Sequence, residues 1–435
     1  SGNRTLNRAT DSPRQPGSSI KPLAAYGPAL DTGAITLASA IDDSPYYYSS
    51  GQLVKNFTAG EYRGLMTVRE AIYRSQNVPA VKVLTLITPQ VGFNYLEKFG
   101  ISTLVSPQKA INGSHDIVQP LALGGMTLGV TNIDMTAAYA AIANHGTYTK
   151  PVYYTAVYDY KGNLLLDNSS SETHTVLKEQ TAWLLTSALE SVITQGTGGA
   201  AALSNQPVAG KTGTTNNETD KWFCGFTPYY TASIWVGYDD NSRQVSSVNH
   251  TSIWRSIMEQ IHSDLPSGEF TKPEDIVEVQ VCSKSGKLPV EGLCDHDPRG
   301  SCIITEYFAA DNQPTESCDT HVKVNICNVS GDIANTGCTS VSTRILTKKP
   351  SSDSIGSNDS GYTTRDAEYS ITEDKLTKLC TLHQRAATSS TNSSSGSTST
   401  NNSNKNNSTT PTTSTSGTTH SSGSSTSTEK TTKHN

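Results

Sequence analysis

Apolar and charged residues are both scarce in this chain of 435 residues, of which 34% are hydrophobic and 17% charged. These fractions are low for a globular protein, so we expect part of the chain not to fold. The deficit is concentrated in residues 386–435, which are almost entirely Ser, Thr, Asn and Gly. Such a segment buries too little apolar surface to offset the entropy lost on ordering. We predict a disordered tail there.

Long apolar runs and long basic runs are also missing. No run approaches the roughly 20 apolar residues that a membrane-spanning helix needs, and no signal peptide is visible. The net charge is −6, so the basic footprint of a nucleic-acid-binding protein is absent and we expect no nucleic-acid partner. Because the sequence starts at Ser1 without a methionine, we expect targeting and anchoring segments upstream of it.

Several common catalytic motifs are absent as well, namely GxSxG, HExxH, the Walker phosphate loop and GxGxxG. The ten histidines lie in polar or loop-like stretches, which disfavours a Ser-His-Asp triad. The remaining candidate chemistry is that of a serine activated by a lysine.

Cysteines are present, and most of them are close together. Six of the eight lie between residues 282 and 338 among Gly, Pro and Asn: Cys282, Cys294, Cys302, Cys318, Cys327 and Cys338. Beside a Ser/Thr/Asn-rich tail we favour disulfides over a metal, with the pairing left open. Cys380 and His383 form a CxxH pattern, for which we favour an ordinary disulfide partner over zinc. We therefore predict no metal site and no cofactor.

Hydrophobic periodicity predicts an α/β (α+β) fold. Helical spacing of apolar residues occurs at 65–88 (with a polar break), 94–100, 132–146, 176–196 and 252–262. Strand-like runs occur at 150–160, 206–215, 220–228 and 229–240. Late strands in quick succession imply an antiparallel sheet, and the helices must cover its faces.

Composition also suggests how the chain is divided. From about Glu269 onward, short β-like pieces are interrupted by Gly and Pro and are dense in cysteine. We predict a main domain at 1–265, a Cys-rich β appendage at 266–385 and the tail at 386–435.

Three short patterns, SxxK, SxN and KTG, carry the candidate chemistry. Only one set of matches has them in this order and in suitable structural contexts. Ser18 and Lys21 open an apolar helix, Ser75 and Asn77 lie between two helices, and KTG begins at Lys211 on a predicted strand. Each pattern alone is weak evidence for an active site. The other matches to these patterns lie in the wrong order or in unsuitable segments. Those other matches are Ser106 with Lys109, Ser427 with Lys430, and a KSG at Lys284.

The stretch RQPGSSIKP offers two serines, and spacing favours the first as the nucleophile. Ser18 has Lys21 three residues on, whereas Ser19 has Pro22 there. A serine at a helix N-terminus also has unpaired N–H groups and the positive end of the dipole beside it, which favour an alkoxide and a tetrahedral oxyanion. Pro22 is tolerated only in the first turn, so it restricts where the helix starts.

The other motif residues suit supporting roles. Lys21 could serve as the base if burial and the nearby Lys211 lower its pKa. Ser75 could relay a proton, and the Asn77 amide could hold a substrate peptide or the lysine. On the strand, Lys211 with the hydroxyls of Thr212 and Thr214 suits a carboxylate, and Gly213 leaves room for a substrate backbone.

RQPGSSIKP, RSQNVPAVK and AGKTGTT resemble the three active-site motifs of penicillin-recognising serine acyltransferases. Flanking phrases such as NRATDSPRQPGS and DKWFCGFTPYYTASIWVGYDD resemble the transpeptidase domain of class A (bifunctional) penicillin-binding proteins of Gram-positive type. The resemblance covers about residues 1–265.

The resemblance implies a D,D-transpeptidase at the extracellular face of the plasma membrane, acting on D-Ala-D-Ala stem peptides and acylated by β-lactams. It implies Ser18 as nucleophile, an oxyanion hole formed by the N–H groups of Ser18 and Thr214, and Lys21 as base. Class A proteins also carry a membrane helix, a glycosyltransferase domain and initial strands before this point. None of these is in the sequence, so we expect the sheet to have an unfilled edge.

Two other functions share this chemistry. A β-lactamase would need a water-activating glutamate, and no convincing ExxxN loop lies between Asn77 and Lys211. A penicillin sensor would be acylated without turning over.

Overall fold

The computed structural model describes residues 6–58, 60–242, 248–349 and 363–383. The predicted tail at 386–435 lies outside these residues. None of the helices that are described is both long and apolar enough to span a bilayer.

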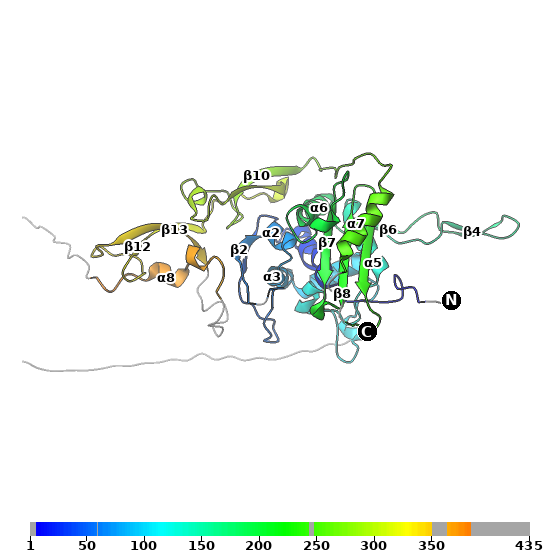
Figure 1. Cartoon of the computed structure of the whole chain (residues 1–435), viewed down its shortest axis with the longest axis horizontal. Coiled ribbons are helices and arrows are strands. Elements are labelled where there is room, and N and C mark those ends of the chain that lie inside the picture. The colour runs from blue at the N-terminus through cyan, green and yellow to red at the C-terminus, as the bar shows by residue number, and fades with distance from the viewer. Residues whose placement is uncertain (1–5, 59, 243–247, 350–362, 384–435) are drawn as a thin grey trace, which may run out of the picture. The chain divides into compact units, whose positions relative to one another are not determined.

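A three-stranded antiparallel sheet lies at the centre of the N-terminal part (Figure 1). Its strands are β7 (Ala209–Thr214), β8 (Asp220–Phe226) and β9 (Thr231–Gly237), in the order β7-β8-β9. Every residue of β8 is buried, and its side chains alternate between two hydrophobic clusters. Trp222, Cys224 and Phe226 belong to the main core, whereas Phe223 packs with Trp254 on the other face. The sheet is therefore covered on both sides, as the sequence predicts.

Helices supply that cover. The longer ones are α3 (Asn77–Ile87), α4 (Pro89–Lys98), α5 (Asn132–Ala143), α6 (Glu179–Thr194) and α7 (His250–Ile261). α5 and α6 contribute buried residues to the main core, and α7 contributes Trp254 and Met258 to the second cluster. Side chains cap α5 and α7, since Thr131 accepts from the N–H of Asp134 and Asn249 from that of Ser252.

The predicted helix over 65–88 is wrong in its first residues. Leu65, Met66 and Thr67 belong to strand β2 (Gly64–Thr67), which pairs with β1 (Ala40–Asp43). Helix α2 (Val68–Tyr73) starts only after Thr67, whose hydroxyl accepts the N–H of Glu70. Pairing with a distant strand therefore overrides the helical pattern.

The segment after Ser18 is helical, as predicted, but it combines three helix types. The order is 3-10 helix η1 (Gly17–Ile20), π-helix η2 (Pro22–Tyr26) and α1 (Gly27–Asp31). The N–H of Gly27 donates to the carbonyl of Pro22, which is the five-residue spacing of a π-turn. All of η2 is buried, so this segment is a core element that presents Ser18 at its start.

Two small antiparallel pairs lie outside the central sheet. β3 (Thr147–Thr149) pairs with β6 (Thr173–Thr175), and β4 (Ala156–Tyr158) pairs with β5 (Leu164–Asp167). The strand predicted at 150–160 is thus shorter than expected and pairs locally.

The Cys-rich region consists of hairpins. β10 (Ile276–Cys282) pairs with β11 (Ile303–Ala309), and β12 (His321–Cys327) pairs with β13 (Val341–Lys349). β14 (Ser370–Thr372) joins β13 in parallel and leads into the short helix α8 (Glu373–Thr377). A buried ion pair of 2.7 Å between Arg69 of α2 and Glu306 of β11 ties this region to the N-terminal part.

The expected disulfides are wrong, because all eight cysteines are free thiols. Six of the seven cysteines after residue 280 lie in two groups, each with one histidine. The groups are Cys282, Cys294, Cys318 and His321, and Cys327, Cys338, Cys380 and His383. The second group holds three thiols, an odd number that S–S bonds within the group cannot all pair.

Candidate active site

The two serines of RQPGSSIKP have different environments. Ser18 in η1 is partly exposed, whereas Ser19 is completely buried. The Ser19 hydroxyl donates to the carbonyl of Pro16 at 2.7 Å, and its own carbonyl accepts from the Tyr139 hydroxyl at 2.7 Å. Ser19 is thus a structural residue, and only Ser18 is open to a solute.

Lys21, three residues after Ser18, is completely buried. Its ammonium donates to the carbonyls of Ser75 and Gln76 at 2.7 and 3.0 Å and to the Asn77 side-chain oxygen at 2.7 Å. These acceptors come from the turn between α2 and α3, where Ser75 has a φ of 57°. The lysine of the first motif is therefore held by the turn that carries the second motif.

Lys211 of β7 reaches the same turn from the opposite side. Its buried ammonium donates to the Ser75 hydroxyl at 2.8 Å and to the Thr212 carbonyl at 3.0 Å. Lys21 lies 3.5 Å from the same hydroxyl. The Ser75 hydroxyl therefore lies between two buried lysines, and the three motifs converge on it.

Burial lowers the pKa of both lysines and so favours their neutral form. Desolvation is the main cause that lowers the pKa of Lys21 well below its ordinary value, and the charge of Lys211 lowers it further. The nearby Asp43 opposes this shift. Burial lowers the pKa of Lys211 to about 7. Both ammonium groups can thus lose a proton far more readily than an exposed lysine.

Strand β7 and the serine-bearing turn meet backbone to backbone. A Cβ on Gly213 would lie 2.4 Å from the Pro16 carbonyl oxygen. Gly17 has a φ of +54°, and a Cβ there would lie 2.6 Å from the Thr214 carbonyl oxygen. Glycine at both positions therefore allows the last residues of β7 to lie directly beside Ser18.

The two threonines are less closely tied to the lysines than the sequence suggests. Thr212 and Thr214 alternate with Lys211 and Gly213 along β7, so their side chains point to the other side of the strand. Both are partly exposed, and the Thr212 hydroxyl bonds that of Thr197 at 2.7 Å.

Supporting residues without a motif were missed by the sequence analysis. Asn56 accepts the N–H of Asn77 at 2.9 Å and donates to buried Asp43 at 2.9 Å, which fixes the start of α3. Trp222 donates its indole N–H to the Gln15 carbonyl at 2.9 Å and braces the serine turn. These contacts span long sequence separations and leave no local pattern that could reveal them.

Comparison with known proteins gives matches in both the N-terminal part and the Cys-rich region. The family model described as penicillin binding protein transpeptidase domain matches residues 2–259, and that of the penicillin-binding protein 1A C-terminal domain matches residues 272–323. Penicillin-binding protein 1A of Clostridium botulinum is 38% identical over 76% of this chain and 40% of its own length. Penicillin-binding protein 1A/1B of Bacillus subtilis is 29% identical over 73% of this chain and 35% of its own length.

A solved structure agrees as well. That of penicillin-binding protein 1A from Haemophilus influenzae has a TM-score of 0.60 and 27% identity, covering 72% of this chain and 50% of the other. This chain spans about 40% of the length of the curated relatives given first. The family model covers more than half of the chain, and the resemblance seen in the motifs is confirmed: the chain belongs to the penicillin-binding protein transpeptidase family.

Proposed function

We propose that this chain is a D,D-transpeptidase that cross-links peptidoglycan stem peptides through an acyl-enzyme on Ser18. The observation that carries the proposal is the convergence of the Ser18 turn, the Ser75 hydroxyl and two buried lysines. A lysine with a lowered pKa next to an accessible serine supplies the base that a hydroxyl nucleophile needs near neutral pH.

The proposed reaction has two acyl transfers. The Ser18 oxygen attacks the carbonyl between the two D-alanines while neutral Lys21 takes the hydroxyl proton. The N–H groups of Ser18 and Thr214 would stabilise the oxyanion. Ser75 would pass a proton to the departing D-alanine amine as the C–N bond breaks. An amine of a neighbouring stem peptide then attacks the ester, and Ser18 regains its proton.

The remaining residues would bind the donor strand and its terminus. Asn77 would orient the stem peptide and Lys21. The space that the sequence assigns to a substrate backbone beside Gly213 is filled by the Pro16 carbonyl, so Gly213 would act by letting β7 lie against the Ser18 turn. The hydroxyls of Thr212 and Thr214, on the partly exposed face of β7, would bind the terminal carboxylate, and the buried charge of Lys211 on the other face would attract it. β-Lactams, which are recognised by this family, would acylate Ser18. The enzyme would act at the extracellular face of the plasma membrane, with stem peptides as partners and without a cofactor.

The test is to label the full chain with fluorescent penicillin and to map the adduct by fragmentation mass spectrometry. We expect a stable adduct on Ser18, together with D-alanine release from a pentapeptide ending in D-Ala-D-Ala. Rapid hydrolysis of the β-lactam would indicate a β-lactamase instead. Stable labelling without D-alanine release or cross-linking would indicate a sensor, and an adduct on Ser19 would contradict the assignment.

The two lysines should give acylation a bell-shaped pH dependence. Lys21 must be neutral, so the second-order rate constant should rise with pH through its lowered pKa. Lys211 must be charged to face a carboxylate, so the rate constant should fall above its pKa of about 7. In Lys211→Arg the guanidinium stays charged, and the alkaline limb should move to higher pH. A flat profile between about pH 5 and 9, or an alkaline limb that Lys211→Arg leaves in place, would contradict these roles.

A further inference from the structure

The Cys-rich region contains two groups of side chains that the transpeptidase reaction does not use. Each consists of three cysteines and one histidine, and the potential ligand atoms of each group lie within 4.8 Å of one another. All four side chains of the first group are buried: Cys282, Cys294, Cys318 and His321. In the second group Cys327 and Cys380 are buried, and Cys338 and His383 are half-buried.

The distances within the groups fit tetrahedral coordination. The Nδ1 atom of His321 lies 3.4 Å from the sulfur of Cys282 and 3.5 Å from that of Cys318. In the second group Nδ1 of His383 lies 3.5 Å from the Cys327 sulfur and 3.3 Å from the Cys380 sulfur. Zinc with ordinary bond lengths to sulfur and nitrogen would hold tetrahedral S and N ligands about 3.6 Å apart.

The two groups are built by an internal repeat. Each begins at the end of a strand, with Cys282 in CSKSG and Cys327 in CNVSG, and ends in a CxxH pattern. The turns have the same backbone hydrogen bonds: the Gly286 N–H donates to the Cys282 carbonyl at 2.8 Å, and the Gly331 N–H donates to the Cys327 carbonyl at 2.8 Å. Both glycines have positive φ angles, 73° and 76°. The same fold thus assembles the same four side chains twice.

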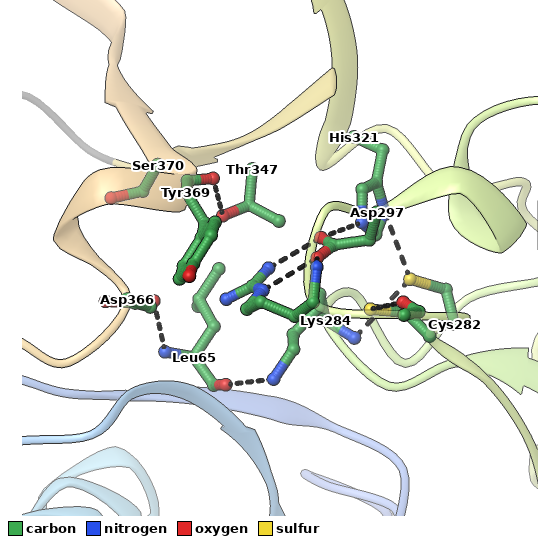
Figure 2. A network of polar contacts seen from close by, with 12 residues as sticks. Leu65, Cys282, Lys284, Asp297, His321, Thr347, Asp366, Tyr369 and Ser370 are labelled. Carbon is green, nitrogen blue, oxygen red and sulfur yellow. Dashed lines mark hydrogen bonds and ion pairs between the residues drawn. The ribbon is translucent and has the colours of Figure 1, made fainter. Parts of the chain in front are cut away.

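Asp297, which is outside the four proposed ligands, orients the histidine of the first group (Figure 2). Nε2 of His321 lies 3.0 Å from a carboxylate oxygen of Asp297, and Arg299 binds both oxygens of that carboxylate at 2.7 Å. A carboxylate on the far nitrogen is the usual partner of a metal-bound histidine, because it fixes the ring and leaves the other nitrogen free to coordinate. The N–H of Lys284 also points at the Cys282 sulfur, at 3.4 Å.

Disulfides explain these groups less well. Cys302 lies near the first group and gives that region an even number of thiols, but the second group has three. Disulfides within it would leave one thiol over and give the histidine no role. Three thiolates and one imidazole, in contrast, form a complete ligand set for a closed structural zinc site.

We propose that the region binds two structural Zn²⁺ ions, one in each Cys₃His group, where the sequence alone had suggested disulfides and no metal. Each thiol gives up its proton to the solvent on binding. The first site would also stabilise the contact with β2. Lys284 follows the ligand Cys282 by two residues, and its ammonium donates to the Leu65 carbonyl at 2.9 Å (Figure 2).

The test is the zinc content of the full chain, purified without chelator and measured by elemental analysis. We expect about two zinc ions per chain, because each closed site holds one. His321→Ala and His383→Ala should each lower the content to about one, because each removes one ligand of one site. His296→Ala is the matched control, since His296 lies in the same region, is 66% exposed and belongs to neither group.

A measurement on the unchanged chain keeps the proposal testable if the variants do not fold. After denaturation with chelator and without reductant, intact mass and thiol alkylation should show eight reduced cysteines. Negligible zinc together with disulfide-linked peptides from either group would overturn the proposal. A content of one zinc that His383→Ala leaves unchanged would overturn the second site.

Discussion

Replacing Ser18 with alanine is expected to abolish labelling by fluorescent penicillin and to lower D-alanine release by about 10⁴-fold or more, the scale on which removal of a serine nucleophile acts. The neighbouring Ser19 cannot take its place, because it is buried and its hydroxyl already donates to the Pro16 carbonyl. The measurement is labelling under saturating penicillin, with circular dichroism to show that the variant is folded.

Ser19→Ala is the matched control for this prediction. It removes one buried hydrogen bond, and we expect it to keep its labelling while losing about 1 kcal/mol of stability. Retained labelling in Ser18→Ala, or a folded Ser19→Ala that no longer labels, would show that the neighbouring serine is the nucleophile.

Replacing Arg69 with alanine should destabilise the chain by about 3–5 kcal/mol, because it leaves a buried carboxylate unpaired. Glu306 is only 2% exposed and pairs with Arg69 at 2.7 Å. The Arg69 guanidinium also donates to the Ser187 carbonyl at 2.9 Å on α6. The change in free energy of unfolding can be measured by denaturant titration with zinc in the buffer.

The same helix provides a control with the same ion-pair distance. Arg74 pairs with Glu70 at 2.7 Å, but these side chains are 37% and 27% exposed. Arg74→Ala should therefore cost at most about 0.5 kcal/mol. The double variant Arg69→Met/Glu306→Leu should regain much of the loss, because it removes both charges. If Arg69→Ala and Arg74→Ala lowered the free energy of unfolding equally, burial of the Arg69 pair would make no difference to stability.

The fold and the gathering of the motifs could be predicted because each part has a local signal. The alternation in β8 and the helical spacing in α5 and α6 are visible in short windows of sequence. The order of the three motifs was enough to expect Lys21, Ser75 and Lys211 in one place, and the structure brings them together.

What could not be predicted depends on pairing between distant segments. Leu65 has a helical pattern but lies in β2, because β1 is available to pair with it. Asn56 supports α3 from 21 residues away, and no motif marks it. The number and setting of the cysteines favour disulfides. The CxxSG and CxxH patterns, each of which occurs at both groups, are the sequence signal for two equivalent groups.

The glycine contacts beside Ser18 bear on how the proposed transpeptidase could become resistant to β-lactams. Gly17 and Gly213 touch opposing backbone at distances that no side chain can occupy, so substitution there would separate β7 from the nucleophile and impair the natural reaction as well. We therefore expect variants selected by a drug to change the exposed edge of the site, such as Thr197 beside Thr212, where a side chain can be altered without moving the backbone. Substitutions at the two glycines would thus be lost with the natural reaction, whereas substitutions at the exposed edge of the site could be retained.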